Sequence, residues 1–248
     1  MANRSEIKRT GKGGLYMPDY LKIYNREASK YDQLIARGDY QNNLIKTISS
    51  IQDLQDKDVV ECGAGTGRLT LFLARLAKSV QAFDITKNML KTAEKKAKKE
   101  KLSNCWFRFG DNRKLPAKDN SADVVIEGWS LFQMASWNFG TWRDALMKSF
   151  GEMKRVMKDV GNIILIETLG TASEVPEVPA SHADFYQFLE FLGFKKTWVR
   201  TDYRFNDVKE AVNLMTFFFG EEVGKKVKER NSNIVPECTG IWWLNEKK

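Results

Sequence analysis

A glycine-rich stretch at 61–67 constrains the fold of this chain more than any other feature. Its sequence is Glu-Cys-Gly-Ala-Gly-Thr-Gly. It follows two valines typical of a buried strand and precedes an apolar segment at 69–77 with helical spacing. Glycines at a strand-to-helix turn let the backbone come close to a ligand. The stretch therefore predicts a ligand site between a strand and a helix.

The spacing and charge of this stretch exclude two common nucleotide motifs. A dinucleotide fingerprint that starts at Gly63 needs a small residue where this chain has Arg68. A P-loop needs Lys followed by Ser or Thr, and that pair is missing. Glu61 instead places a carboxylate at the strand end, which would repel a pyrophosphate and attract a cation. A ligand with a positive group is therefore favoured.

An acid also ends the next predicted strand, at 79–84. Asp84 lies 17 residues after Gly67. In nucleotide-binding βαβ units an acid at this place accepts hydrogen bonds from ribose hydroxyls. Asp84 supports a unit of this kind without choosing between ligands.

Four segments resemble the class I S-adenosylmethionine (SAM)-dependent methyltransferases, and the ubiquinone and menaquinone (methyltransferase type 11) enzymes in particular. Glu-x-Gly-x-Gly-x-Gly at 61–67 resembles their motif I. Asp-x-Thr-x-x-Met-Leu at 84–90 and Gly-Asp-x-x-x-Leu-Pro at 110–116 resemble two further motifs. The segment 24–32 resembles their aromatic entry helix, with Asn25 in place of the first Asp. The resemblance extends over 24–244.

The resemblance implies that SAM is the cofactor and S-adenosylhomocysteine the product. It also implies that Asp111 accepts from the adenine amino group and that the amide of the next residue meets a ring nitrogen. The residues to which it assigns cofactor binding are Glu61, Gly63, Ala64, Gly65, Gly67, Asp84, Ile85, Met89, Asp111, Asn112, Glu127 and Gly128.

The order of predicted elements indicates an α/β fold. The resemblance implies a doubly wound, Rossmann-like sheet of seven mostly parallel strands, with the last strand antiparallel to the sixth. We expect the sixth strand at 198–205 and the seventh at 239–244. We expect a mobile basic tail at 1–14 and a single domain at 15–248. That domain would carry a helical cap at 15–51 and a helical insertion at 206–233.

The composition is that of an ordinary soluble globular protein, 42% hydrophobic and 29% charged. No apolar run is long enough to span a bilayer, and the first residues lack the apolar core of a secretory signal. The three cysteines are odd in number and lack metal-binding spacing. We therefore expect a cytoplasmic protein without a bound metal.

The sequence contains less information about the residues that would bind the methyl acceptor. Ligands bind at the carboxyl ends of parallel strands, so the loop after 122–127 is expected to border the transferred methyl group. Tryptophans at 129, 137 and 142 are expected around that loop. No general base is assigned. Its candidates are His182, for which a capping or surface role is favoured, and Glu127, Tyr20 and Tyr24, with Glu167 as a further alternative.

A small-molecule acceptor is the favoured substrate, and two alternatives stay open. The net charge of +8 suggests an RNA methyltransferase. Many of the positive charges are lysines at 87–101, where they are typical of a solvated helix face, and no RNA-binding motif is evident. The other alternative is a non-catalytic protein that binds SAM or acts as a partner scaffold.

Overall fold

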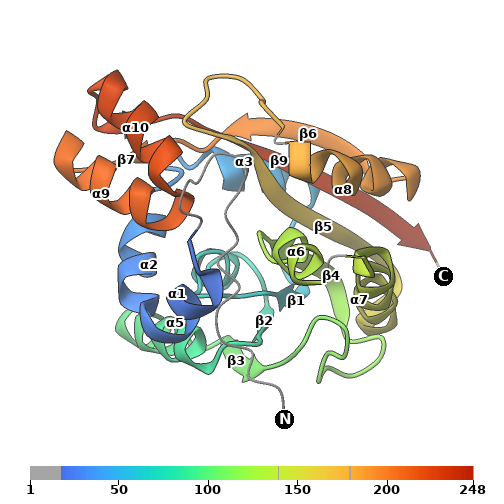
Figure 1. Cartoon of the computed structure of the whole chain (residues 1–248). Helices are drawn as coiled ribbons and strands as arrows, with labels where there is room; N and C mark the ends of the chain where they lie inside the picture. The colour runs from blue at the N-terminus through green and yellow to red at the C-terminus, as the bar shows by residue number, and fades with distance from the viewer. Residues whose placement is uncertain (1–17, 139, 179, 248) are drawn as a thin grey trace, which may run out of the picture.

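The computed structural model describes residues 18–138, 140–178 and 180–247, so the expected tail at 1–14 lies outside the described residues. A seven-stranded sheet with the strand order β3-β2-β1-β4-β5-β9-β6 forms the centre (Figure 1). Neighbouring strands from β3 to β5 are parallel, and β9 lies antiparallel between β5 and β6. The expected fold class is confirmed. The strands are β1 (Asp58–Cys62), β2 (Ser79–Asp84), β3 (Cys105–Phe109), β4 (Ala122–Gly128), β5 (Met157–Thr171), β6 (Lys195–Arg200) and β9 (Glu237–Lys247).

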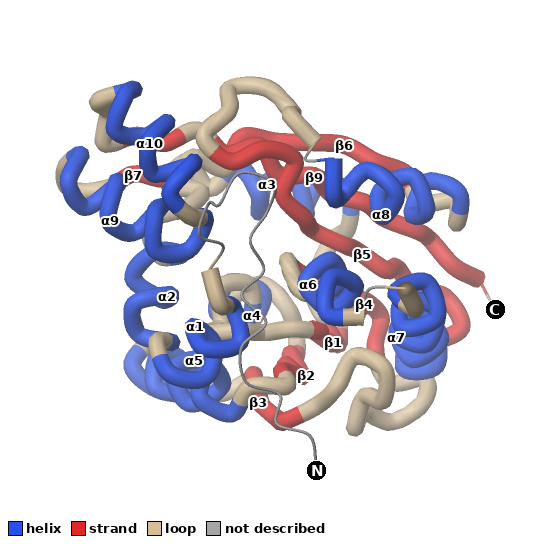
Figure 2. Tube along the Cα trace, in the orientation of Figure 1, coloured by secondary structure: helices blue, strands red, loops and turns tan. Residues whose placement is uncertain are grey.

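The central strands are apolar on both faces because helices cover both sides of the sheet (Figure 2). Successive side chains of a strand point to opposite faces. Thus Val124 of β4 belongs to the core with α3 and α4, whereas Val125 belongs to the core with α6, α7 and α8. A continuous apolar run is what such a doubly covered parallel strand requires. The covering helices are α3 (Asn43–Ile51), α4 (Thr70–Leu73), α5 (Lys87–Lys99), α6 (Leu131–Trp137), α7 (Trp142–Val156) and α8 (Ala180–Phe191).

A helical cap stands beside the sheet and joins distant parts of the chain (Figure 1). It combines α1 (Tyr20–Arg26) and α2 (Ala28–Ile35) with α9 (Val208–Phe219) and α10 (Glu221–Arg230). The aromatic rings of Tyr20 and Phe218 lie 5.2 Å apart and link the two halves. The insertion thus packs on the N-terminal helices.

Two expected elements are divided in the structure. The expected strand at 198–205 is wrong as one unit, because the chain leaves the main sheet at Thr201 and Asp202. Their carbonyls accept hydrogen bonds from Asp39 and Tyr40, and the chain then forms β7 (Tyr203–Arg204), which pairs with β8 (Ile234–Val235). The helical insertion divides at Gly220, whose φ of 90° ends α9.

No helix in the described ranges is long and apolar enough to cross a membrane.

Candidate functional site

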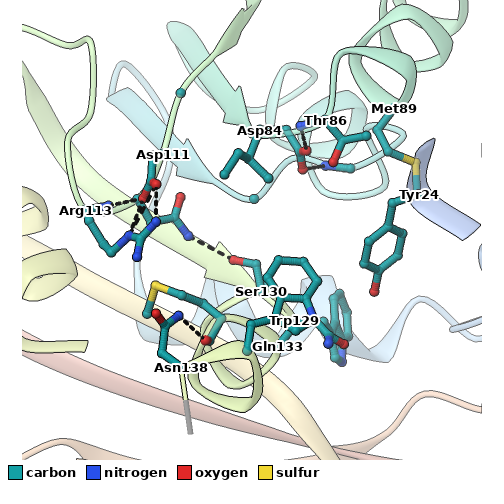
Figure 3. Close-up of a pocket in the computed structure, with 18 of the residues that line it drawn as sticks. Tyr24, Asp84, Thr86, Met89, Asp111, Arg113, Trp129, Ser130, Gln133 and Asn138 are labelled. Carbon is teal, nitrogen blue, oxygen red and sulfur yellow. Dashed lines mark hydrogen bonds and ion pairs between the residues drawn. The ribbon is translucent and has the colours of Figure 1, made fainter. Parts of the chain in front are cut away.

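A pocket opens at the carboxyl ends of β1, β2 and β4, the edge at which α/β sheets bind ligands (Figure 3). It holds about 780 Å³ of empty space, including its mouth. Eight of the twelve residues expected to bind a cofactor line this pocket: Gly63, Gly65, Asp84, Ile85, Met89, Asp111, Asn112 and Gly128.

The glycine turn after β1 forms one wall of the pocket. Gly63 and Gly65 have φ values of 75° and 54°, a left-handed backbone that favours glycine. A Cβ atom on Gly63 would collide with the hydroxyl of Ser130, whereas a Cβ on Gly65 would meet no atom within 4 Å. The backbone at Gly65 is therefore open to a ligand.

Asp84 joins this turn to the start of α5. Its Oδ2 accepts from the Gly65 amide at 2.8 Å, and its Oδ1 accepts from the Thr86 amide at 2.7 Å. Burial raises the pKa of the Asp84 carboxyl, and these hydrogen bonds oppose that rise. The carboxylate lies in the pocket wall, where it has capacity to accept from a ligand hydroxyl.

The loop after β3 forms another wall and is tied to the start of α6. Asp111 accepts from the backbone amide of Arg113 at 2.8 Å and from its Nη2 at 2.6 Å, and the pKa of Asp111 is lowered mainly by these bonds. Asn112 Nδ2 donates to Ser130 Oγ at 3.1 Å. Ser130 therefore contacts both the glycine turn and this loop, a role that no sequence motif indicated.

Aromatic side chains form the wall nearest the cap. Tyr24 of α1 lies 5.7 Å from the ring of Tyr31 and 6.4 Å from that of Trp137, measured between centroids. Trp129 has a φ of 56°, and the guanidinium of Arg68 covers its ring at 4.3 Å. All four aromatic residues line the pocket. Trp142, the third expected tryptophan, instead packs on Phe185 and Phe188 of α8.

Residues 53–214 match the sequence model of a family described as a methyltransferase domain, which is more than half of the chain. The chain belongs to this family. Its fold, motif I and pocket are those of the class I SAM-dependent methyltransferases, and SAM is its cofactor. The open backbone at Gly65 and the acid at the end of β2 fit this group.

The methyltransferase domain is similar to known proteins in sequence and structure. It is 25% identical over 160 residues to the demethylmenaquinone methyltransferase of Lactiplantibacillus plantarum, covering 62% of this chain and 64% of that one. Across the first three curated relatives, the match covers 34–64% of their length. A SAM-dependent methyltransferase from Aquifex aeolicus shares the fold, with a TM-score of 0.53 and 18% identity over 81% of this chain and 88% of that one. The [4+2]-cyclase SpnF does so too, with a TM-score of 0.55 and 16% identity over 83% and 81%.

Four of the expected cofactor residues lie behind the pocket wall of the methyltransferase domain. Glu61 is 1% exposed, and its Oε2 accepts from the hydroxyl of Thr70 at 2.5 Å. It thus anchors the start of α4. Glu127 is also buried and accepts from amides of α6. Ala64 and Gly67 complete the turn from behind, where the Gly67 amide donates to the Ala64 carbonyl at 2.8 Å.

Of the five candidate bases, only Tyr24 belongs to the pocket lining. The ring of Tyr20 stacks on that of Tyr24, with 6.3 Å between their centroids. His182 stacks on Phe132 at 3.4 Å and shares a hydrogen bond with Ser181, and burial lowers its pKa to about 4. Several lining residues were not assigned to the site from the sequence. Thr86 and Gly110 belong to the motifs at 84–90 and 110–116, whereas no fixed motif position marks Arg113, Ser130, Gln133, Met134 and Asn138.

The buried Glu61 makes the stability of the methyltransferase domain depend on pH. Burial raises its pKa from 4.5 to about 8. Between these values the unfolded state is ionised and the folded state is protonated, so folding binds a proton. We expect the free energy of unfolding to fall as pH rises from 5 to 8.5, with Glu61 contributing on the order of 2–4 kcal/mol. Urea unfolding at the two pH values measures this fall.

The matched variants are Glu61→Gln and Glu152→Gln. The amide of Glu61→Gln still accepts from Thr70 and never ionises, so the pH slope should become shallower. Glu152 has a lowered pKa because of Arg155, so its replacement should leave the slope in this range unchanged. An unchanged slope in Glu61→Gln would contradict the assignment.

Proposed function

We propose that this chain transfers the methyl group of SAM to a small-molecule acceptor by in-line displacement. One observation carries the proposal: a single pocket has the glycine turn and Asp84 in one wall and the aromatic side chains of Tyr24, Trp129 and Trp137 in another. The cap helix α1 contributes Tyr24 to the second wall. The pocket thus offers adjoining space for a cofactor and an acceptor.

Positioning is the main task of the protein in this reaction. SAM, when bound, supplies a methyl group that its sulfonium has already activated. Holding two reactants in line contributes about 7–11 kcal/mol to a rate enhancement. Aromatic faces in the wall favour a nearby positive charge by about 0.5–2 kcal/mol. The residues of the pocket therefore need to orient, enclose and stabilise rather than to react.

The acceptor is proposed to bring a nucleophile that needs no deprotonation by the protein. Burial raises the pKa of Tyr24 well above its usual value and that of Tyr31 to about 12, so both remain protonated at neutral pH. They can donate hydrogen bonds to an acceptor but cannot take its proton. No histidine lies among the described lining residues. The similarity to demethylmenaquinone methyltransferases and the aromatic wall together support a planar aromatic acceptor.

The test is to incubate the protein with SAM labelled in its methyl group and with fractionated cell extract. We expect label in the small-molecule fraction, together with an equal amount of S-adenosylhomocysteine. Label in the RNA fraction would contradict the small-molecule acceptor. Binding of SAM without transfer to any fraction would favour a non-catalytic protein. Asp84→Ala, which is expected to bind the cofactor more weakly, serves as the control and should transfer less label at limiting SAM.

A further inference from the structure

Two buried carboxyl groups hold the first turn of α6. Glu127, near the end of β4, accepts through Oε1 from the amides of Ser130 at 2.5 Å and Leu131 at 2.9 Å. Glu167, near the end of β5, accepts through Oε1 from the amide of Phe132 at 2.9 Å. The first amides of a helix have no partner within it. Here two neighbouring strands supply those partners.

The start of α6 in turn determines the shape of the cofactor pocket. Ser130 donates its hydroxyl to Glu127 at 2.8 Å and accepts from Asn112 at 3.1 Å. It also packs so closely on Gly63 that no Cβ would fit there. Further along, Gln133, Met134 and Trp137 of α6 line the pocket. A shift of this helix would therefore move both cofactor loops and the aromatic wall.

The two carboxyl groups are buried away from solvent, so the charge of one affects the pKa of the other. They are 0% and 3% exposed, and Glu127 Oε2 has no hydrogen-bond partner in the described structure. Burial raises the pKa of Glu127 to about 7 and that of Glu167 well above its usual value, and the charge of Glu127 adds to the second rise. Like charges in a buried site disfavour double ionisation.

The described groups around this pair include no cation that would balance a second negative charge. Helix α6 itself carries no titratable side chain. The titratable groups whose pKa values respond to the pair are Glu61 and Cys62 on β1, Tyr24 on α1 and Tyr186 on α8, and Glu237 of β9 in turn affects Tyr186. All of these groups are acids, so each is either neutral or negative. His182 of α8 stacks on Phe132 in the first turn of α6, but burial lowers its pKa to about 4, so it is neutral in the pH range concerned.

We propose that Glu127 and Glu167 are positioning residues that hold α6 against the cofactor pocket while they carry only one negative charge between them. With one carboxyl group protonated, a single negative charge lies at the helix start, where the amides stabilise it. Ionisation of the second carboxyl group places two unbalanced charges under α6 and displaces the helix. Cofactor affinity therefore falls as the pair becomes fully ionised. This regulation rests on the proposed function, because it acts through the SAM pocket.

The experiment measures the affinity of S-adenosylhomocysteine by calorimetry between pH 6.5 and pH 9. The wild type should lose about tenfold in affinity over this range, the equivalent of one pKa unit. Glu167→Gln still accepts from Phe132 but cannot ionise, so its affinity should change less than about threefold. The fluorescence of Trp137, which lies in α6, should shift with pH in the wild type and stay constant in this variant.

Glu237→Gln is the matched control. Glu237 is buried, has a pKa of about 7 and has an unpartnered oxygen, but its carboxylate accepts from Thr168 rather than from α6. This variant should follow the wild-type profile, and ionisation of the ligand affects all variants equally. Glu127→Gln replaces Glu167→Gln if the latter does not fold. The same pH profile in Glu167→Gln and wild type, or a flat wild-type profile, overturns the positioning role alone. No binding at any pH overturns the proposed function as well.

Discussion

Replacing Gly65 with alanine is expected to weaken S-adenosylhomocysteine binding by about 5- to 150-fold, because forcing a methyl group into filled space costs about 1–3 kcal/mol. No atom of the described residues lies within 4 Å of the new Cβ atom, and we propose that the cofactor fills this space. The φ of 54° adds backbone strain of about 1–2 kcal/mol. Calorimetric titration gives the loss of affinity, and urea unfolding gives the strain separately.

Gly193→Ala is the control for this prediction. Gly193 also has a positive φ, 88°, and open space around its Cα, but it follows α8 and does not line the pocket. The two variants should lose similar amounts of stability, and only Gly65→Ala should bind S-adenosylhomocysteine more weakly. Equal ligand affinity in both variants would mean that the cofactor does not approach the backbone at Gly65.

Removing the carboxylate of Asp84 is the second change with a large expected effect. Asp84→Ala leaves the amides of Gly65 and Thr86 without their acceptor and removes the acid from the pocket wall. A hydrogen bond to a charged group contributes about 1.5–3 kcal/mol, so the loss of one such bond to the ligand is expected to lower S-adenosylhomocysteine affinity by about 10- to 150-fold. Asp84→Asn, which keeps one oxygen acceptor, should lose less.

Asp58→Ala tests whether the loss is local. Asp58 lies at the opposite end of the sheet, at the start of β1, and its carboxylate binds Ser79 and Lys158. Its removal should lower stability slightly and leave ligand affinity unchanged. If Asp58→Ala lowered the ligand affinity as much as Asp84→Ala does, the loss would reflect a general decrease in stability.

The features that the sequence predicted correctly depend on local chemistry. The bounds of β2 were predicted as the structure has them, because its buried residues Val80, Ala82 and Phe83 stand between polar residues at the two ends of the strand. The antiparallel last strand was also correct, although it rested on the family resemblance. By contrast, the division of 198–205 depends on the backbone of Asp39 and Tyr40, which lie some 160 residues earlier in the chain.

The same distinction applies to the site. The turn with Gly63 and Gly65 was predicted because its positive φ values favour glycine, and glycines can be recognised in the sequence. The contacts of Ser130 with Gly63 and Asn112 could not be predicted from the sequence. They exist only because β1, the loop after β3 and the start of α6 meet in the fold. Glu61 was predicted to face a cation, yet its hydrogen bond to Thr70 turns it behind the wall. A sequence pattern indicates that an acid ends a strand but not which way its side chain turns.

Thermal unfolding with and without S-adenosylhomocysteine shows whether this protein binds the product of SAM, with NADH as the control ligand. A ligand present at about 100 times its dissociation constant stabilises the folded state by about 2.7 kcal/mol. For a chain of this size the unfolding temperature should rise by roughly 5–10 °C. We expect this rise in unfolding temperature with S-adenosylhomocysteine and none with NADH. No rise with S-adenosylhomocysteine, or a rise with NADH instead, would contradict the reading of the glycine turn and of Asp84 as a SAM site.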